Sequence, residues 1–175
     1  MPYDFRSDPI LSQAYAYWQA KCAGRAMPRR ADIEPKDLIR LLPYLQITEI
    51  LEGGKRIRYR LVGTAIVNAY GAELTGKYFD EVFTGERLKL IEENYRTMCR
   101  TKRPILVGNR YHTRKDMELF CYRVVMPLSE DGETVNQVLT AMSFKQPEPR
   151  IGDAQLTAQN DKFDVAGSSC DVLYD

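Results

Sequence analysis

The sequence predicts an α+β domain in which an amphipathic helix precedes a five-stranded antiparallel sheet covered by short helices. Two observations carry this prediction: five strand-like segments are joined by turn sequences, and glycine-broken helical segments lie between the second and third strands. Strands joined by short hairpins run antiparallel, which leaves a face of the sheet for the helices. With 175 residues, the chain is long enough to bury a core without disulfides or metals.

The first predicted element is a helix over residues 9–23. Asp8 is a typical N-cap, Pro9 suits the first helical position and Gly24 favours the helix end. Apolar residues at helical spacing form one stripe on this helix: Leu11, Ala14, Tyr15, Trp18 and Cys22. The stripe has two interpretations, packing against the chain's own domain or a homodimer contact made by its members other than Ala14.

A β-hairpin is the next strong signal. After a linker and a short connector helix opened by Pro35, two strand-like runs flank residues 52–55, whose paired glycines tolerate positive φ. The second strand alternates three apolar residues with three arginines: Ile57, Tyr59 and Leu61 with Arg56, Arg58 and Arg60. This alternation predicts a buried face and a solvated arginine face, with a polyanion-binding row as the alternative.

Helical segments follow Gly63, and strands complete the domain. The short helical segments are residues 64–70, 72–75 and 79–83. A longer helix over about residues 86–99 ends in basic residues before Pro104. The remaining strands are residues 105–112, 118–128 and 135–144, joined by turns at 113–117 and 129–133. The predicted inner face of the sheet comprises Phe120, Tyr122, Val124 and Met126, together with Val138, Thr140, Met142 and Phe144.

The charge is unevenly distributed along the chain. Residues 146–175 hold two basic and six acidic side chains, a net charge of −4, which leaves +5 before them and +1 overall. We therefore predict three parts: an N-terminal helix and linker over 1–34, a domain over 35–145, and an acidic, disordered tail over 146–175. The near-zero total argues against nucleic-acid binding. Without a transmembrane stretch or leader, the chain is expected to be cytoplasmic, with no membrane partner.

Three segments resemble a bacterial subfamily of the PAS domain family. They are YAYWQAKCAGRAMPRRADIEP at 15–35, YRLVGTAIVNAYGAELTG at 59–76 and MPLSEDGETVNQV at 126–138, which carry RLVGT, G-x-E-L-T-G and L-P-L-S-x-D-G patterns, with Met126 at the first position of the last. The resemblance covers about residues 10–145 and implies helices over the concave face of the sheet and a sensory or regulatory role without catalysis. It also implies a homodimer formed through the N-terminal helix, and action by binding an unidentified signalling protein partner, by rearrangement of the dimer or as a stand-alone adaptor.

The cofactors common in that family do not match this sequence. Its haem-binding members use a His on the long helix, whereas His112 is the only His here. Its flavin photosensors use a Cys in an N-C-R-F-L-Q-like helix, whereas Cys99 lies in the sequence TMCR. Four scattered Cys and one His are too few for a His/Cys metal cage. We therefore predict no cofactor and no metal.

A small apolar ligand, held non-covalently between sheet and helices, is the remaining sensory hypothesis, with an ordinary filled core as the alternative. The candidate pocket residues are Ile66, Tyr70, Leu74, Phe79, Val82, Leu90, Tyr95, Tyr111, Phe120, Tyr122 and Met142. The competing class is a small α+β enzyme of the isomerase or dehydratase type with an apolar pocket. Such an enzyme needs an acid–base pair, and only His112 and Asp116 approach one. We predict no catalytic residue.

Overall fold

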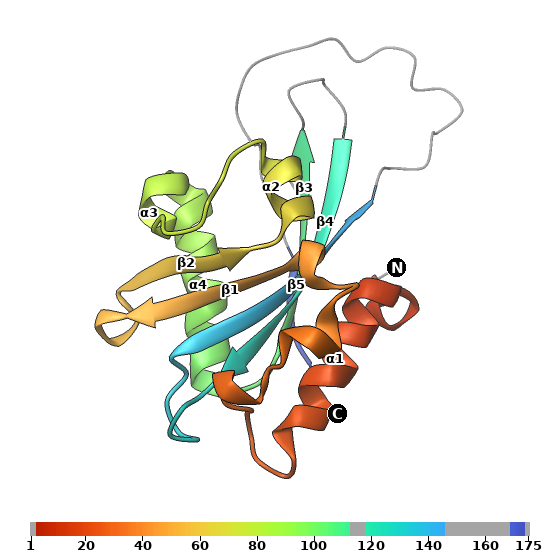
Figure 1. The fold of residues 1–175 in the computed structure, drawn as a ribbon. Coiled ribbons are helices and arrows are strands. Elements are labelled where there is room, and N and C mark those ends of the chain that lie inside the picture. Colours follow the sequence, from red (N-terminus) through yellow and green to blue (C-terminus); the bar gives the residue numbers. More distant parts are fainter. Residues whose placement is uncertain (1–2, 113–117, 146–168, 174–175) are drawn as a thin grey trace.

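The computed structural model describes residues 3–112, 118–145 and 169–173, and its strands form one antiparallel sheet (Figure 1). The strands are β1 (Leu45–Leu51), β2 (Arg56–Val62), β3 (Ile105–His112), β4 (Glu118–Leu128), β5 (Gln137–Lys145) and β6 (Ser169–Val172). Their spatial order is β2-β1-β5-β4-β3-β6. The α+β prediction is confirmed, and β1 to β5 are the five strands that the sequence predicts.

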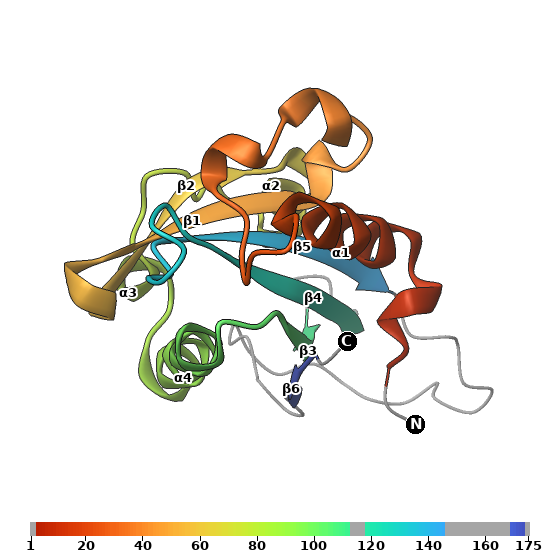
Figure 2. The ribbon, with the colours of Figure 1, turned by 90° about the horizontal axis from the view of Figure 1, so that it is seen from below.

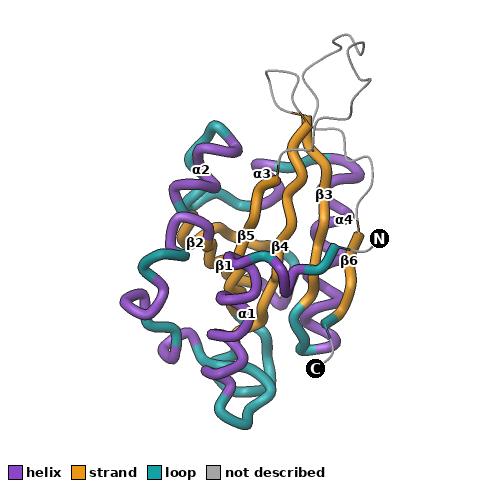
Figure 3. Tube along the Cα trace, turned by 90° about the vertical axis from the view of Figure 1, so that its right-hand side faces the viewer, coloured by secondary structure: helices purple, strands orange, loops and turns teal. Residues whose placement is uncertain are grey.

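Helices cover both faces of this sheet. They are α1 (Pro9–Cys22), α2 (Thr64–Tyr70), α3 (Phe79–Val82) and α4 (Gly85–Thr101). Short 3-10 turns occur at Phe5–Ser7, Arg30–Asp32, Pro35–Leu38, Leu42–Tyr44 and Glu52–Gly54. Figure 2 shows α1 and α4 on opposite sides of the strands, and Figure 3 shows α1 in front of the sheet. The helix predicted over 72–75 is wrong: these residues form turns between Gly71 and Gly76, which have φ values of 68° and 86°.

The N-terminal helix belongs to the same hydrophobic core as the sheet. Asp8 caps it as predicted, because Oδ1 accepts hydrogen bonds from the N–H groups of Ile10 (2.9 Å) and Leu11 (3.2 Å). Trp18 is 5% exposed, and its indole N–H donates to the Pro127 carbonyl at 2.9 Å. The predicted N-terminal helix and linker over 1–34 therefore contribute to the core of the domain, since α1 and the strands share one hydrophobic cluster.

Burial within the single chain accounts for the α1 stripe by packing against its own sheet. Leu11, Ala14, Tyr15 and Trp18 are buried within a single chain, and Cys22 is half-buried. This burial agrees with the interpretation in which the stripe packs against the chain's own sheet. The buried members of the stripe are not available as a dimer contact while α1 is docked.

The inner face predicted for β4 is wrong. In the β4–β5 register, Arg123 lies opposite Met142 and Tyr122 lies opposite Ser143. Arg123 therefore points to the side of α4, whereas Tyr122 points to the side of α1, where its ring stacks on Tyr3 at 3.5 Å. Because both faces of the sheet are covered, β4 carries apolar residues on both, and alternation alone does not identify the inner one.

The tail contributes the sixth strand, so disorder over the whole of 146–175 is wrong. Ser169–Val172 pairs antiparallel with β3, with Ile105 opposite Val172 and Gly108 opposite Ser169. The Leu173 N–H then donates to the Pro104 carbonyl at 2.9 Å. A segment pairs with the edge of a sheet through its backbone N–H and C=O groups, so its amino-acid composition does not predict the pairing. The rest of the predicted tail and the predicted loop at 113–117 lie outside the described residues.

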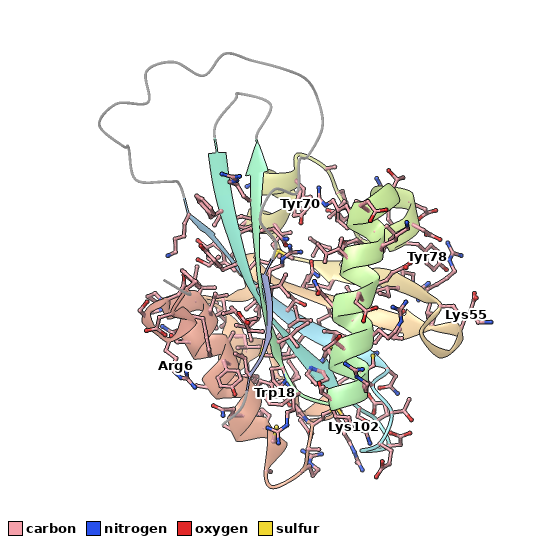
Figure 4. The ribbon with its side chains drawn as sticks, turned by 180° about the vertical axis from the view of Figure 1, so that it is seen from behind. Arg6, Trp18, Lys55, Tyr70, Tyr78 and Lys102 are labelled. Carbon is pink, nitrogen blue, oxygen red and sulfur yellow. The ribbon has the colours of Figure 1, made fainter. Side chains whose placement is uncertain are left out.

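The arginines of β2 lie on the face opposite Ile57 and Tyr59, and each has an acidic partner. The predicted burial of Leu61 is wrong: this residue is 40% exposed, because the β1–β2 register shifts between Tyr59 and Leu61. Arg58 (2.6 Å) and Arg60 (2.7 Å) bind the Glu49 carboxylate, and their hydrogen bonds lower its pKa. Arg56 lies 3.2 Å from Asp80 and over the ring of Tyr78, which is beside this hairpin in Figure 4. Intramolecular pairing explains this row without a polyanion. In the described ranges, no helix is long and apolar enough to span a membrane.

Gly63, at the exit of β2, occupies a position with no room for a side chain. A Cβ there would lie 2.3 Å from the Pro43 carbonyl oxygen and 2.4 Å from that of Leu42. We expect Gly63→Ala to lower the free energy of unfolding by about 1–3 kcal/mol, because the backbone must shift to relieve the overlap. Urea denaturation measures this loss. Thr64→Ala, at the exposed next position, is the control, and equal stability of the two variants would contradict the expectation.

Candidate functional site

A cavity of about 30 Å³, partly open to solvent, lies between α4 and strands β3 and β4. Figure 4 shows α4 lying across this face of the sheet. The cavity is lined by Arg87, Leu90, Ile91, Asn94, Tyr95, Val107, Asn109, Arg123 and Val125. Two half-buried arginines and two buried asparagines therefore border the cavity beside aliphatic and aromatic side chains.

A second cavity of about 20 Å³ adjoins the first and extends toward β1 and β2. Its lining residues are Gln46, Tyr59, Phe79, Phe83, Ile91, Tyr95, Arg123, Val125 and Thr140. The two cavities share Ile91, Tyr95, Arg123 and Val125. We name the two together the α4 pocket. A water molecule needs about 10–15 Å³ of such space, so the α4 pocket holds a few non-hydrogen atoms.

Polar side chains are held in place around the α4 pocket. The Tyr95 hydroxyl and the Thr48 hydroxyl are 3.0 Å apart and share a hydrogen bond. Burial raises the pKa of Tyr95, so its hydroxyl stays protonated. The Arg123 guanidinium donates to Asn109 Oδ1 on the neighbouring strand. These bonds fix the direction in which Tyr95 and Arg123 face the cavities.

Gln46 adds an unsatisfied polar group to the α4 pocket. Its side chain lies on β1 beside the second cavity and is 4% exposed. Within the part of the chain that the structure describes, Gln46 Oε1 accepts no hydrogen bond. A buried amide oxygen without a donor costs about 1–3 kcal/mol, so a donor supplied by a ligand or a water would stabilise this position.

Aromatic side chains close the α3 side of the α4 pocket. The Phe79 ring meets Tyr59 at 4.6 Å, Tyr95 at 5.3 Å and Phe83 at 6.0 Å between ring centroids. The Arg87 guanidinium lies over the Phe83 ring at 4.4 Å. Such cation–π and edge-to-face contacts order the wall of the second cavity and keep Arg87 near it.

Comparison with known proteins identifies this architecture. A family model described as PAS domain matches residues 6–143. The chain belongs to the PAS domain family. Among solved structures, it is similar to the Rhodobacter sphaeroides LOV protein and to the RsLOV d2 variant, each at 11% identity, 70% coverage of either chain and a TM-score of 0.45. A search of curated proteins found no match.

The PAS assignment confirms the resemblance to the PAS domain family and indicates a sensory module, so the isomerase-like alternative is not favoured. The match begins at residue 6, before α1, which agrees with the shared core of α1 and the sheet.

Three of the predicted pocket residues of this PAS domain line the α4 pocket: Phe79, Leu90 and Tyr95. Ile66 and Met142 lie on the same side of the sheet but form a separate packed cluster with Cys121, against which Tyr70 packs. Further predicted residues lie elsewhere: Leu74 in the main core, Val82 at its margin, and Phe120 and Tyr122 on strand positions facing α1. The Tyr111 side chain lies outside the described residues.

Most polar residues of the α4 pocket were missed by sequence analysis; the exceptions are Tyr95, a predicted pocket residue, and Thr140, predicted on the inner face of the sheet. Asn109 and Arg123 lie on strand positions that face α4, and Gln46 and Thr140 pair with one another across β1 and β5. The sequence signal for them is alternation along a strand. A polar residue two positions from a buried apolar residue points to the same side of the sheet. Recognising it requires the register, which the sequence pattern alone left open.

Two thiols of this PAS domain, those of Cys99 and Cys121, lie in environments that favour the protonated form. Cys22, Cys99 and Cys121 form no disulfide, and burial raises the pKa of the Cys99 and Cys121 thiols. Over the described ranges, no three His, Cys, Asp or Glu side chains gather in a way that could hold a metal ion. The polar α4 pocket is therefore the candidate functional site.

Proposed function

We propose that this PAS domain is a cytoplasmic sensory module that binds a small polar ligand in the α4 pocket and acts on a signalling protein partner. The observation that carries the proposal is a set of buried and half-buried polar side chains around two cavities that share four lining residues, where a purely structural core would be apolar. Drug-sized ligands occupy pockets of roughly 300–1,000 Å³. Cavities of about 30 and 20 Å³ favour a far smaller ligand.

Strand β4 offers a route by which an occupied α4 pocket would affect the opposite face. Arg123 borders the cavities, and the adjacent Tyr122 stacks on Tyr3, beside the start of α1. On β5, Thr140 faces the α4 pocket while Ser143 donates to Asp8, the N-cap of α1. A ligand that shifts these strands would therefore change the position of α1 on the sheet. We propose that the signalling protein partner recognises this change in α1.

Filling the α4 pocket tests the proposal. Native mass spectrometry of the protein from its own host, together with a thermal-shift panel of charged and neutral small molecules, is expected to find a ligand. Ile91→Phe adds a ring at a residue that lines both cavities, so binding is expected to fall at least 10-fold. Leu88→Phe on the same helix is the control, because Leu88 packs on the core outside the cavities. No bound molecule and no thermal shift would leave a protein adaptor instead.

A further inference from the structure

The charged side chains that line the α4 pocket are all positive. The lining includes the guanidinium-bearing residues Arg87 and Arg123, and no Asp or Glu is among the residues that line either cavity. Burial raises the pKa of the Cys121 thiol, whereas the positive charges of Arg123 and Arg87 act in the opposite direction. The two arginines therefore exert their field on the interior. In such partly dehydrated surroundings, opposite charges attract more strongly than in water.

The neighbours of Arg123 suit the recognition of a planar anion. Arg123 borders both cavities and donates to Asn109 Oδ1, which holds the guanidinium against the sheet. A guanidinium has five N–H donors in a planar fork, so it can bind Asn109 and a carboxylate together. A guanidinium fixed in this way loses little freedom when it binds an anion.

The other residues that line the α4 pocket indicate which chemical groups the anion has besides its charge. Leu90, Ile91 and Val125 offer apolar contact that suits a short carbon chain and gives nothing to a bare phosphate or sulfate. In the second cavity, Gln46 Oε1 is buried without a donor, and the buried Thr140 hydroxyl lies on the adjacent strand. A ligand hydroxyl directed at Gln46 would supply that donor.

We infer that the α4 pocket is specific for a short carboxylate of two or three carbons that carries a hydroxyl group. Its carboxylate binds Arg123, with Arg87 adding positive charge, and its hydroxyl donates to Gln46. This inference rests on the proposed function, because it names the ligand class of the same pocket. The size follows from the two cavities, and the charge follows from the two arginines.

Calorimetric titration of the full chain with lactate, glycolate and the neutral amide lactamide tests the charge. We expect lactate and glycolate to bind, lactamide to bind at least 10-fold more weakly, and Arg123→Gln to weaken lactate binding about 10- to 100-fold. Arg58→Gln removes the same charge from the opposite face of the sheet and is expected to leave the affinity unchanged. Circular dichroism checks that each variant is folded, and Arg123→Lys, which keeps the charge, is expected to retain part of the affinity.

Propionate, which lacks the hydroxyl, tests the role of Gln46. We expect lactate to bind more tightly than propionate in the wild type, and Gln46→Leu to abolish that preference while leaving propionate binding intact. Equal affinity for lactate and lactamide, or an unchanged affinity in Arg123→Gln, would overturn the inference while leaving a ligand-binding PAS domain. If no carboxylate or neutral molecule in the thermal-shift panel binds, the proposed function fails as well.

Discussion

Trp18→Ala is expected to lower the free energy of unfolding by about 3–5 kcal/mol, the range seen when a buried Trp or Phe is truncated. Trp18 is the only Trp in the chain and is 5% exposed. Its ring lies beside Tyr15, and its indole N–H holds the Pro127 carbonyl of β4 at 2.9 Å. Truncation leaves a cavity between α1 and the sheet and removes this hydrogen bond. Urea denaturation followed by far-UV circular dichroism measures the loss, because the variant has no Trp fluorescence.

Two further variants separate the contributions of Trp18. Trp18→Phe keeps an aromatic ring but loses the bond to Pro127, so an intermediate loss is expected. Gln13→Ala, on the exposed side of the same helix, is expected to change stability by less than about 0.5 kcal/mol. Light scattering tests the alternative interpretation. If the wild type is a dimer, and Trp18→Ala is a monomer whose free energy of unfolding is unchanged, then Trp18 acts as a dimer contact.

Local signals determined much of this fold. Asp8 and Pro9 marked the start of α1 correctly, because capping depends on residues within one turn. Strands β3 and β4 begin and end at the predicted residues, since turn-forming or proline-containing segments flank them. The segment 72–75 was predicted as a helix from its composition, yet two glycines with positive φ confine it to turns. Strand β6 escaped prediction because its pairing partner, β3, is more than 50 residues away in the chain.

The α4 pocket was less accessible to sequence reasoning than the fold. Phe79, Leu90 and Tyr95 were found because apolar residues on a helix face usually mark a core. Arg123 was missed because an arginine within a strand is ordinarily assigned to solvent. The sequence pattern predicts its apolar neighbours, Tyr122 and Val124, on the inner face of β4, which places Arg123 on the outer face. A strand buried on both faces removes the alternation on which that assignment depends. The polar character of the site therefore emerges only from strand register.

Asp8→Ala is expected to lower the free energy of unfolding by about 3 kcal/mol, because the carboxylate serves two structural purposes. Its Oδ1 caps α1, and its Oδ2 accepts from the Tyr3 hydroxyl (2.6 Å), the Ser143 hydroxyl (2.6 Å) and the Lys145 ammonium (2.9 Å). The Asp8 side chain is 1% exposed, so its partners have no replacement acceptor when it is removed. Asp4→Ala, which removes an exposed capping hydrogen bond from the 3-10 turn Phe5–Ser7, is the control, with an expected loss of about 1 kcal/mol.

The same carboxylate makes stability depend on pH in the acid range. Burial by itself would raise the pKa of Asp8, but hydrogen bonds from Ser143, Tyr3 and Lys145 outweigh it and lower the pKa from 3.8 to about 2. The stabilisation is therefore complete above the unfolded pKa near 3.8 and is lost as the pH falls through about 2. Asp8→Asn keeps a capping oxygen and removes the charge, so the stability difference between wild type and variant is expected to shrink by on the order of 2 kcal/mol from pH 6 to pH 2. Denaturation across this range measures it, and parallel pH profiles would mean that the Asp8 charge does not hold α1 to the sheet.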